Sequence, residues 1–166
     1  AHLGDGTGHG IGGQRHRLGV EVAPRDHHRA FAAGLGVVLG QKATEEKSNE
    51  ITAIPVLLDM LAIESCVVTV DAMGCQQDIA QKILDKKAEY ILMVKDNQKT
   101  LKQQIEKVFT LEKPSHSHSR TDMGHGRVEK RECSVISELR FLDDRSHWPG
   151  LQSIVKVRSE RAEKKT

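Results

Sequence analysis

The stretch CVVTVD, residues 66–71, decides the fold that the sequence predicts. Its continuous β-branched run is typical of a strand covered on both faces, as in the centre of an α/β sheet, and this strand ends on Asp71. A second apolar run at residues 90–94 (YILMV) predicts another buried strand, which ends on Lys95. Apolar residues at helical spacing separate the two runs. This strand–helix–strand order predicts parallel strands joined by a right-handed crossover.

Helical spacing of apolar residues recurs in three segments, at residues 51–61, 79–88 and 101–109. Pro55 must lie in the first turn of the first helix or kink it, because its ring displaces a backbone hydrogen bond. Asp96 and Asn97 are expected to cap the third helix. Upstream of all three, residues 31–39 predict a strand with a glycine turn at 34–36.

The first 29 residues differ in composition from the rest of the chain. Ten of the fourteen glycines lie within the first 40 positions, and five of the nine histidines precede Arg29. The segment lacks apolar periodicity, so we expect an irregular region that buries too little surface to fold. Its GxGxxG-like spacing lacks the flanking strand and helix of a dinucleotide site, and its histidines show no repeated metal-ligand spacing.

The last third of the chain, residues 114–166, has a β-rich character. Residues 115–120 are polar and predict a loop. Residues 127–136 and 151–158 predict strands joined through the Trp-Pro-Gly turn at 148–150, with the tryptophan as its anchor. Alternation along the first of these strands places four polar side chains on one face, namely His125, Arg127, Glu129 and Arg131. This ladder suits cross-strand ion pairs or DNA-backbone contacts better than catalysis.

Composition limits the classes of protein that the chain can represent. Hydrophobic residues make up 37% of it, no apolar stretch approaches the ~18 residues of a membrane span, and no basic-then-apolar leader opens the sequence. Three cysteines make no disulfide framework, which is typical of a reducing, cytoplasmic location. Between Gln98 and Cys133, eight Lys and Arg stand against five Asp and Glu, a modest basic excess compatible with nucleic acid.

Polar residues at the predicted carboxyl ends of the strands are the candidates for chemistry, because functional groups of open α/β sheets gather there. Asp71 can ligate a hard cation through oxygen, or it can cap the helix that follows. Lys95, Asn97, Gln98 and Lys99 lie at a strand end and helix start, where backbone N–H groups favour phosphate. These four can contact DNA, or they can simply solvate a helix terminus.

Five blocks in this order resemble the DDE transposases of the H-repeat-associated insertion sequences. The blocks are VLGQ and KSNEI within residues 38–51, VVTVDAMGCQ at 67–76, YILMVKDNQK at 90–99, GHGRVE at 124–129 and WPGL at 148–151. The resemblance runs from about residue 30 to the C-terminus, and five ordered blocks are far more specific than any one of them.

The resemblance implies an RNase H-like core in which three acidic residues bind two divalent ions, Mg²⁺ or Mn²⁺. It also implies cleavage and rejoining of double-stranded DNA at transposon ends, and a homodimer for full-length members. Asp71 matches the second acid and would ligate the metal. Asp5 is a candidate for the first acid, although Thr7 stands where the family has lysine. The third acid is expected on a helix beyond the Trp-Pro-Gly turn, and the chain ends before it.

The fold class expected is therefore α/β, with three regions. Residues 1–29 form a Gly/His-rich segment that does not match the family, residues 30–113 a partial RNase H-like core (a mixed sheet with flanking helices), and residues 114–166 the start of a β-rich insertion. We expect a transposase fragment, truncated at both ends and inactive by itself, since one dependable carboxylate cannot position two cations. The alternatives are a degenerate remnant that only binds DNA or has no role, and an unrelated phosphotransfer domain with Asp71 as nucleophile. Unpaired sheet edges also predict poor solubility.

Overall fold

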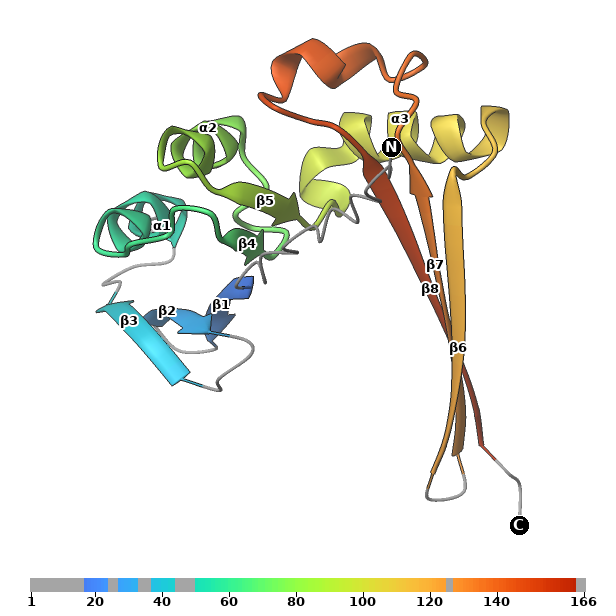
Figure 1. The fold of residues 1–166 in the computed structure, drawn as a ribbon, viewed down its shortest axis with the longest axis horizontal. Coiled ribbons are helices and arrows are strands. Elements are labelled where there is room, and N and C mark those ends of the chain that lie inside the picture. The colour runs from blue at the N-terminus through green and yellow to red at the C-terminus, as the bar shows by residue number, and fades with distance from the viewer. Residues whose placement is uncertain (1–16, 24–26, 33–36, 44–49, 125–126, 164–166) are drawn as a thin grey trace, which may run out of the picture.

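A computed structural model of the chain describes residues 17–23, 27–32, 37–43, 50–124 and 127–163. These residues form a five-stranded mixed sheet flanked by helices, and a second, three-stranded antiparallel sheet that extends away from it as a long ribbon (Figure 1). The α/β fold class predicted from the sequence is confirmed. Within the ranges given above, no helix is long and apolar enough to cross a membrane.

The five-stranded sheet has the order β3-β2-β1-β4-β5. Its strands are β1 (Arg17–Ala23), β2 (His27–Ala32), β3 (Val37–Ala43), β4 (Val67–Val70) and β5 (Glu89–Leu92). The first three pair antiparallel, whereas β1, β4 and β5 run parallel. The predicted parallel pair is therefore present, and it forms one half of a mixed sheet.

The expectation that residues 1–29 are irregular is wrong where the structure describes them, because β1 and the start of β2 lie there. Leu18, Val20 and Val22 occupy alternate positions of β1, a pattern that the surrounding glycines and histidines hide. Strand β1 lies between β2 and β4, so partners on both sides satisfy its backbone groups. Residues 1–16, which include Asp5, lie outside the described residues.

The apolar run at residues 31–39 does not form one strand. It is divided between β2 and β3, which pair antiparallel with Ala32 opposite Val37. The glycines that were expected to make a turn within the strand, at residues 34–36, lie outside the described residues. An interrupted run of small apolar residues is equally compatible with one bent strand or with two paired strands, and only long-range pairing distinguishes them.

All three predicted helices are present, as α1 (Glu50–Asp59), α2 (Gln77–Asp85) and α3 (Lys99–Leu111). Pro55 lies inside α1, beyond its first turn. The expectation that Asp96 and Asn97 cap α3 is wrong, because they belong to a short 3₁₀ turn, η2 (Asp96–Gln98), that precedes the helix. A second 3₁₀ segment, η3 (Asp143–His147), lies before the Trp-Pro-Gly turn.

Helices α1 and α2 cover one face of the five-stranded sheet (Figure 1), where Val68 and Val70 are buried in a core with residues of both helices. Along β4 the exposure alternates between half-buried and buried positions, so the face of Val67 and Thr69 is covered less completely than the face of Val68 and Val70. Strand β5 lies at the edge of the sheet, and Ile91 on it is 52% exposed. The expectation of a second fully buried strand is wrong, because on this edge strand Tyr90 and Leu92 pack against the core while Ile91 is exposed.

The ribbon consists of β6 (His116–Gly124), β7 (Arg127–Ile136) and β8 (Ile154–Glu163), with β7 in the centre. The predicted strand at 127–136 is confirmed, and that predicted at 151–158 begins later and runs further. The expected loop at 115–120 is wrong, because all but its first residue belong to β6. Every residue of β6 pairs with a residue of β7, so backbone pairing, which a polar sequence does not reveal, makes the strand.

A second hydrophobic core joins α3 to the base of the ribbon. It contains Leu101 and Val108 from α3, Ile136 and Ile154 from the ribbon, and Trp148, which is 5% exposed. The prediction that the tryptophan anchors the Trp-Pro-Gly turn is thereby confirmed. The turn also contacts elements of the five-stranded sheet, because the hydroxyl of Tyr90 on β5 donates to the Pro149 carbonyl at 2.7 Å. Gly150 has a positive φ of 66°, and a Cβ atom there would lie 2.8 Å from Cδ1 of Leu84 on α2.

Candidate active site at the end of β4

Asp71 directly follows β4, at the carboxyl end of the parallel half of the sheet. The last residue of β4, Val70, pairs with Val20 of β1 on one side and with Leu92 of β5 on the other. Asp71 is therefore one position beyond paired residues on both neighbouring strands. On β1, Glu21 is likewise the residue after Val20, the last one that pairs with β4.

The alternation of the strand assigns Asp71 to the sheet face opposite the two helices. Val68 and Val70 point into the core beneath α1 and α2, so Thr69 and Asp71 belong to the other face. Asp71 is half-buried there. On the neighbouring segment, Ile91 of β5 and Met93, which directly follows β5, are about half exposed. The Asp71 carboxylate thus lies at an accessible surface beside apolar side chains.

Asp71 does not cap the following helix. The residue in the N-cap position of α2 is Gln76, five residues further along the chain. The contact of the Asp71 carboxylate is local instead: its Oδ1 accepts from the backbone N–H of Gly74 at 3.5 Å. This distance is at the outer limit of a hydrogen bond. The interpretation of Asp71 as a helix cap is therefore wrong, and the carboxylate orders only the first turn of its own loop.

Gly74 allows the loop after β4 to pass close to the core. A Cβ atom at this position would overlap the side chain of Val70 and lie 2.8 Å from Cδ1 of Ile54. Only a residue without a side chain fits such a close approach of backbone to core. The glycine in the sequence block that resembles the transposases therefore has a packing reason in this chain.

The four residues expected to contact phosphate divide into two pairs. Lys95 and Lys99 are exposed on either side of η2. Asn97 and Gln98 point their amides at the loop after β4: Asn97 Nδ2 donates to the Ala72 carbonyl, and Gln98 Nε2 donates to the Cys75 carbonyl at 2.8 Å. The structure thus brings the second pair to the loop that begins at Asp71.

The charged ladder on β7 forms ion pairs within the ribbon. Arg131 Nη2 lies 2.8 Å from Glu129 Oε1, and the Ser159 hydroxyl donates to the same oxygen at 3.0 Å. The hydrogen bond from Arg131 is the main cause that lowers the pKa of Glu129 below its ordinary value. The closer of these ion pairs joins two residues of β7 itself, whereas the cross-strand pair that was expected is represented by Arg161 Nη2 of β8, which lies 4.0 Å from Glu129 Oε2. His125 lies outside the described residues, and Arg127 and Arg131 lie on β7 of the ribbon, whereas Asp71 follows β4 of the other sheet.

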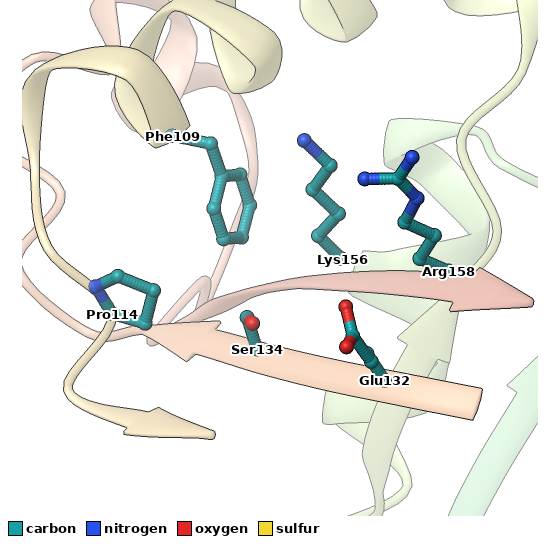
Figure 2. Close-up of a pocket in the computed structure, with 6 residues that line it drawn as sticks. All are labelled: Phe109, Pro114, Glu132, Ser134, Lys156 and Arg158. Atoms are coloured by element: carbon teal, nitrogen blue, oxygen red, sulfur yellow. The ribbon is translucent and has the colours of Figure 1, made fainter. Parts of the chain in front are cut away.

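A small pocket of about 220 Å³ lies where α3 meets the ribbon. Figure 2 shows the residues that line it, which come from α3, from the ribbon and from the segment between them: Phe109, Pro114, Glu132, Ser134, Lys156 and Arg158. The Lys156 ammonium lies 5.6 Å from the centroid of the Phe109 ring, a cation–π contact. Sequence reasoning missed this pocket, because residues from separate elements build it and share no local spacing.

The described side chains do not complete a metal site. In the part of the chain that the structure covers, no group of three or more His, Cys, Asp or Glu residues is placed to hold an ion. Asp71 is the candidate hard oxygen donor at this edge, and Glu21 follows the last residue of β1 that pairs with β4. Sequence reasoning missed Glu21 because it did not recognise β1 as a strand. The alternation in RLGVEVA (17–23) was the signal that could have found it.

The chain is similar to known transposases over most of its length. The profile of the family described as "Transposase DDE domain" matches residues 5–161. "Putative transposase YncI" of Escherichia coli O157:H7 is 45% identical over 141 residues, covering 81% of this chain and 36% of that protein. In Escherichia coli K12, "H repeat-associated putative transposase YhhI" is 43% identical, covering 82% of this chain and 38% of that protein. "H repeat-associated putative transposase YbfD" of the same strain is 44% identical, covering 66% of this chain and 46% of that protein.

The chain spans less than half the length of these curated relatives. The family match begins at residue 5, so most of residues 1–29, which were expected not to match, fall within it. The rival interpretation as an unrelated phosphotransfer domain is not supported, because the match covers the strands and helices of that proposed domain. The resemblance first seen in five sequence blocks is confirmed, and the chain belongs to the DDE transposase family.

Proposed function

We propose that this chain carries part of the metal-dependent DNA cleavage and strand-transfer centre of an insertion-sequence transposase, with Asp71 as one ligand of the divalent cation. The observation that carries this proposal is the position of Asp71, directly after β4 and on the sheet face that α1 and α2 leave open. Carboxylate oxygens are the ligands that Mg²⁺ prefers, and Mn²⁺ accepts the same donors. When bound, such ions activate the attacking oxygen and stabilise the leaving oxygen of a phosphodiester.

The ligand set of the described residues is incomplete for that chemistry. Asp71 is one candidate donor, and Glu21 follows Val20, the last residue of β1 that pairs with β4. Two-metal sites need several carboxylates from separate elements to fix both ions. We therefore derive no catalytic step here, and we propose that the 166-residue chain does not cleave DNA by itself.

Binding of Mn²⁺ tests the role of Asp71 without requiring activity. Because Mn²⁺ is paramagnetic, it should broaden the backbone amide NMR signals of residues near Asp71, at lower concentration than those of the ribbon. The Asp71→Asn variant should lose this selective broadening, since an amide oxygen is a weaker ligand than a carboxylate. Asp78→Asn, an exposed change on α2, is the matched control. Equal broadening in wild type and Asp71→Asn would refute the proposed ligand.

A supercoiled plasmid that carries a transposon end tests the proposed inactivity. We expect no nicking above background with Mg²⁺ or Mn²⁺. Robust cleavage that Asp71→Asn abolishes would show that the chain completes its own site, and would overturn the proposal that it is inactive by itself. Cleavage that persists in Asp71→Asn would point to a contaminating nuclease, and repurification of both samples would resolve it.

The second candidate function is binding of double-stranded DNA at transposon ends without catalysis. The observation that favours it is the exposure of Lys95 and Lys99 on either side of η2, near the loop of Asp71. Each phosphate contact adds about −0.9 to the slope of log affinity against log salt concentration. Lys95→Ala and Lys99→Ala should each make the slope shallower by about that amount, whereas Lys113→Ala after α3 should not. An unchanged slope in both would exclude this surface.

The homodimer that the resemblance implies remains a proposal about the whole family protein.

A further inference from the structure

The loop that carries Asp71 is short and is closed mainly by its own backbone. Between β4 and α2, the N–H of Cys75 donates to the Ala72 carbonyl at 3.2 Å, and the N–H of Gln76 donates to the Gly74 carbonyl at 2.9 Å. These bonds join residues two or three positions apart. They shape the turn, but they do not tie it to the rest of the molecule.

The hydrogen bonds that connect the loop to another part of the fold come from η2, the 3₁₀ turn after the neighbouring strand β5. Two consecutive side-chain amides of η2, those of Asn97 and Gln98, donate to the carbonyls of Ala72 and Cys75. Both acceptor residues are buried. The two carbonyls lie on either side of the turn at Met73 and Gly74, so η2 holds the loop at two points, and these two hydrogen bonds form a clamp.

We propose that Asn97 and Gln98 are positioning residues that fix the loop after β4, and through it the Asp71 carboxylate, and that they are not contacts to DNA. The proposal rests on the proposed function only for what Asp71 does once it is positioned. The link to the carboxylate is the Gly74 N–H, which belongs to the clamped turn and donates to Asp71 Oδ1.

The side chains of the block KDNQK (95–99) point in two directions. Its two lysines are exposed, its two amides point inward at the loop, and Asp96 pairs with Lys102 at 2.8 Å on the outer side. A nearby phosphate would meet the lysines. The amide nitrogens are already oriented by backbone carbonyls, so their role is to order the neighbouring loop.

Neutral, nearly isosteric variants test the clamp without adding charge near Asp71. Asn97→Leu and Gln98→Met each remove one hydrogen bond to the loop. We expect the amide hydrogen exchange of Cys75 and Gln76 to rise about fivefold in each variant, as for the loss of one such bond. Gln103→Met, the same change at an exposed position of α3, is the control and should leave exchange at the loop unchanged. If Gln98→Met does not fold, Gln98→Asn shortens the amide by one methylene and should still raise exchange at Cys75.

Two spectroscopic measurements separate positioning from mere stability. The ¹³C chemical shift of the Asp71 carboxyl should change in Asn97→Leu and Gln98→Met but not in Gln103→Met. Selective Mn²⁺ broadening near Asp71 should require several-fold more Mn²⁺ in the clamp variants, while their affinity for DNA stays that of wild type. Unchanged loop exchange, or an unchanged carboxyl shift, would overturn the proposal, as would loss of DNA affinity alone. If wild type shows no selective broadening, the metal-ligand proposal fails, whereas the exchange and carboxyl measurements still decide the clamp.

Discussion

At the scale of single residues, the site depends on how closely backbone and side chains approach at the end of β4. Asp71 has one local hydrogen bond, from Gly74, while Gly74 lies against the core and Ala72 and Cys75 are held from η2. A small carboxylate on an ordered loop is well suited to hold an ion, because little conformational entropy is lost on binding. The same close packing makes the loop sensitive to added volume.

Gly74→Ala should destabilise the protein by about 1–3 kcal/mol, because the new methyl group would overlap Val70 and approach Ile54. Urea unfolding followed by circular dichroism measures the change. Met73→Ala is the control, since the Met73 side chain is exposed and its loss should cost little. A free energy of unfolding for Gly74→Ala within ~0.5 kcal/mol of wild type would show that the loop can move away from the core.

The thiol of Cys75 should be unreactive in the folded protein. It is fully buried, and burial raises its pKa from 9.0 to about 11. Iodoacetamide at about pH 8 should therefore modify Cys66 and Cys133, which are only half-buried, before Cys75. Mass spectrometry of the alkylated peptides gives the order. Modification of Cys75 at the rate of Cys66 would contradict the burial described here.

The Cys75 thiol also predicts how the free energy of unfolding depends on pH. The pKa of Cys75 is raised in the folded protein. Its contribution to the free energy of unfolding is therefore complete below pH 9.0 and is lost as pH rises from there towards about 11. In this window the unfolded chain binds fewer protons, so the free energy of unfolding should fall, by up to about 1.4 kcal/mol per pH unit. Cys75→Ala should lack this part of the decline, as measured by urea unfolding across the window. Identical slopes in both proteins would exclude Cys75 as the cause.

At the scale of elements, the two sheets are stabilised in different ways. Strands β4 and β5 depend on a hydrophobic core with α1 and α2. The outer part of the ribbon depends on backbone pairing and on exposed ion pairs such as Lys130 Nζ to Glu132 Oε1 at 2.5 Å. Exposed ion pairs contribute little, about 0–1 kcal/mol each, so continuity of the central strand β7 should decide whether the ribbon forms.

Lys130→Pro should therefore disrupt the outer ribbon and leave the five-stranded sheet intact. Proline removes a backbone donor from β7, which pairs on both sides, with Thr121 of β6 and Glu160 of β8. Hydrogen exchange of the outer residues of β6 and β8 should rise at least about tenfold, while the amides of β4 keep their protection. Lys130→Ala, which removes only the ion pair, should leave hydrogen exchange unchanged both in the outer ribbon and in β4. Loss of protection in β4 as well would mean that the two sheets unfold as one unit.

At the scale of the whole molecule, the described residues bury two apolar clusters, and α1 and α2 pack on one face of the five-stranded sheet while apolar side chains on the opposite face are exposed. Ile91 is 52% exposed and Met93 50% exposed on that face, beside Asp71 at the sheet edge. Exposed apolar side chains on an edge strand favour association with other chains. The structure does not test the expectation of poor solubility, but it identifies the surface around Ile91 and Met93 as the place where self-association would occur.

Ile91→Lys should reduce self-association more than a similar change elsewhere. The lysine would place a charge on the edge strand β5, where it opposes edge-to-edge pairing. Static light scattering at increasing protein concentration measures the association. Leu111→Lys is the control, because Leu111 is 55% exposed at the end of α3, away from the sheet edge. An equal reduction in both variants would show that general charge, and not this face, controls solubility.

The sequence by itself determined the order β4–α2–β5–α3, the strand β7 and the transposase family. Helical and strand periodicities are local, and so are the blocks that carry the resemblance, such as those around Asp71 and Lys95. Strands whose pattern is weak were misread: β1 was hidden among glycines and histidines, and the polar strand β6 resembles a loop. Both exist because partner strands pair with them.

Only the tertiary structure decided which face of the sheet Asp71 belongs to, that β1 pairs with β4 up to the residue before Glu21, and that Asn97 and Gln98 bond to the loop after β4. The last two of these facts join residues more than twenty positions apart, and no spacing along the chain encodes such a contact. Strand order and register bring these residues together, because hydrogen bonding between strands and burial of one sheet face are satisfied by the folded chain as a whole.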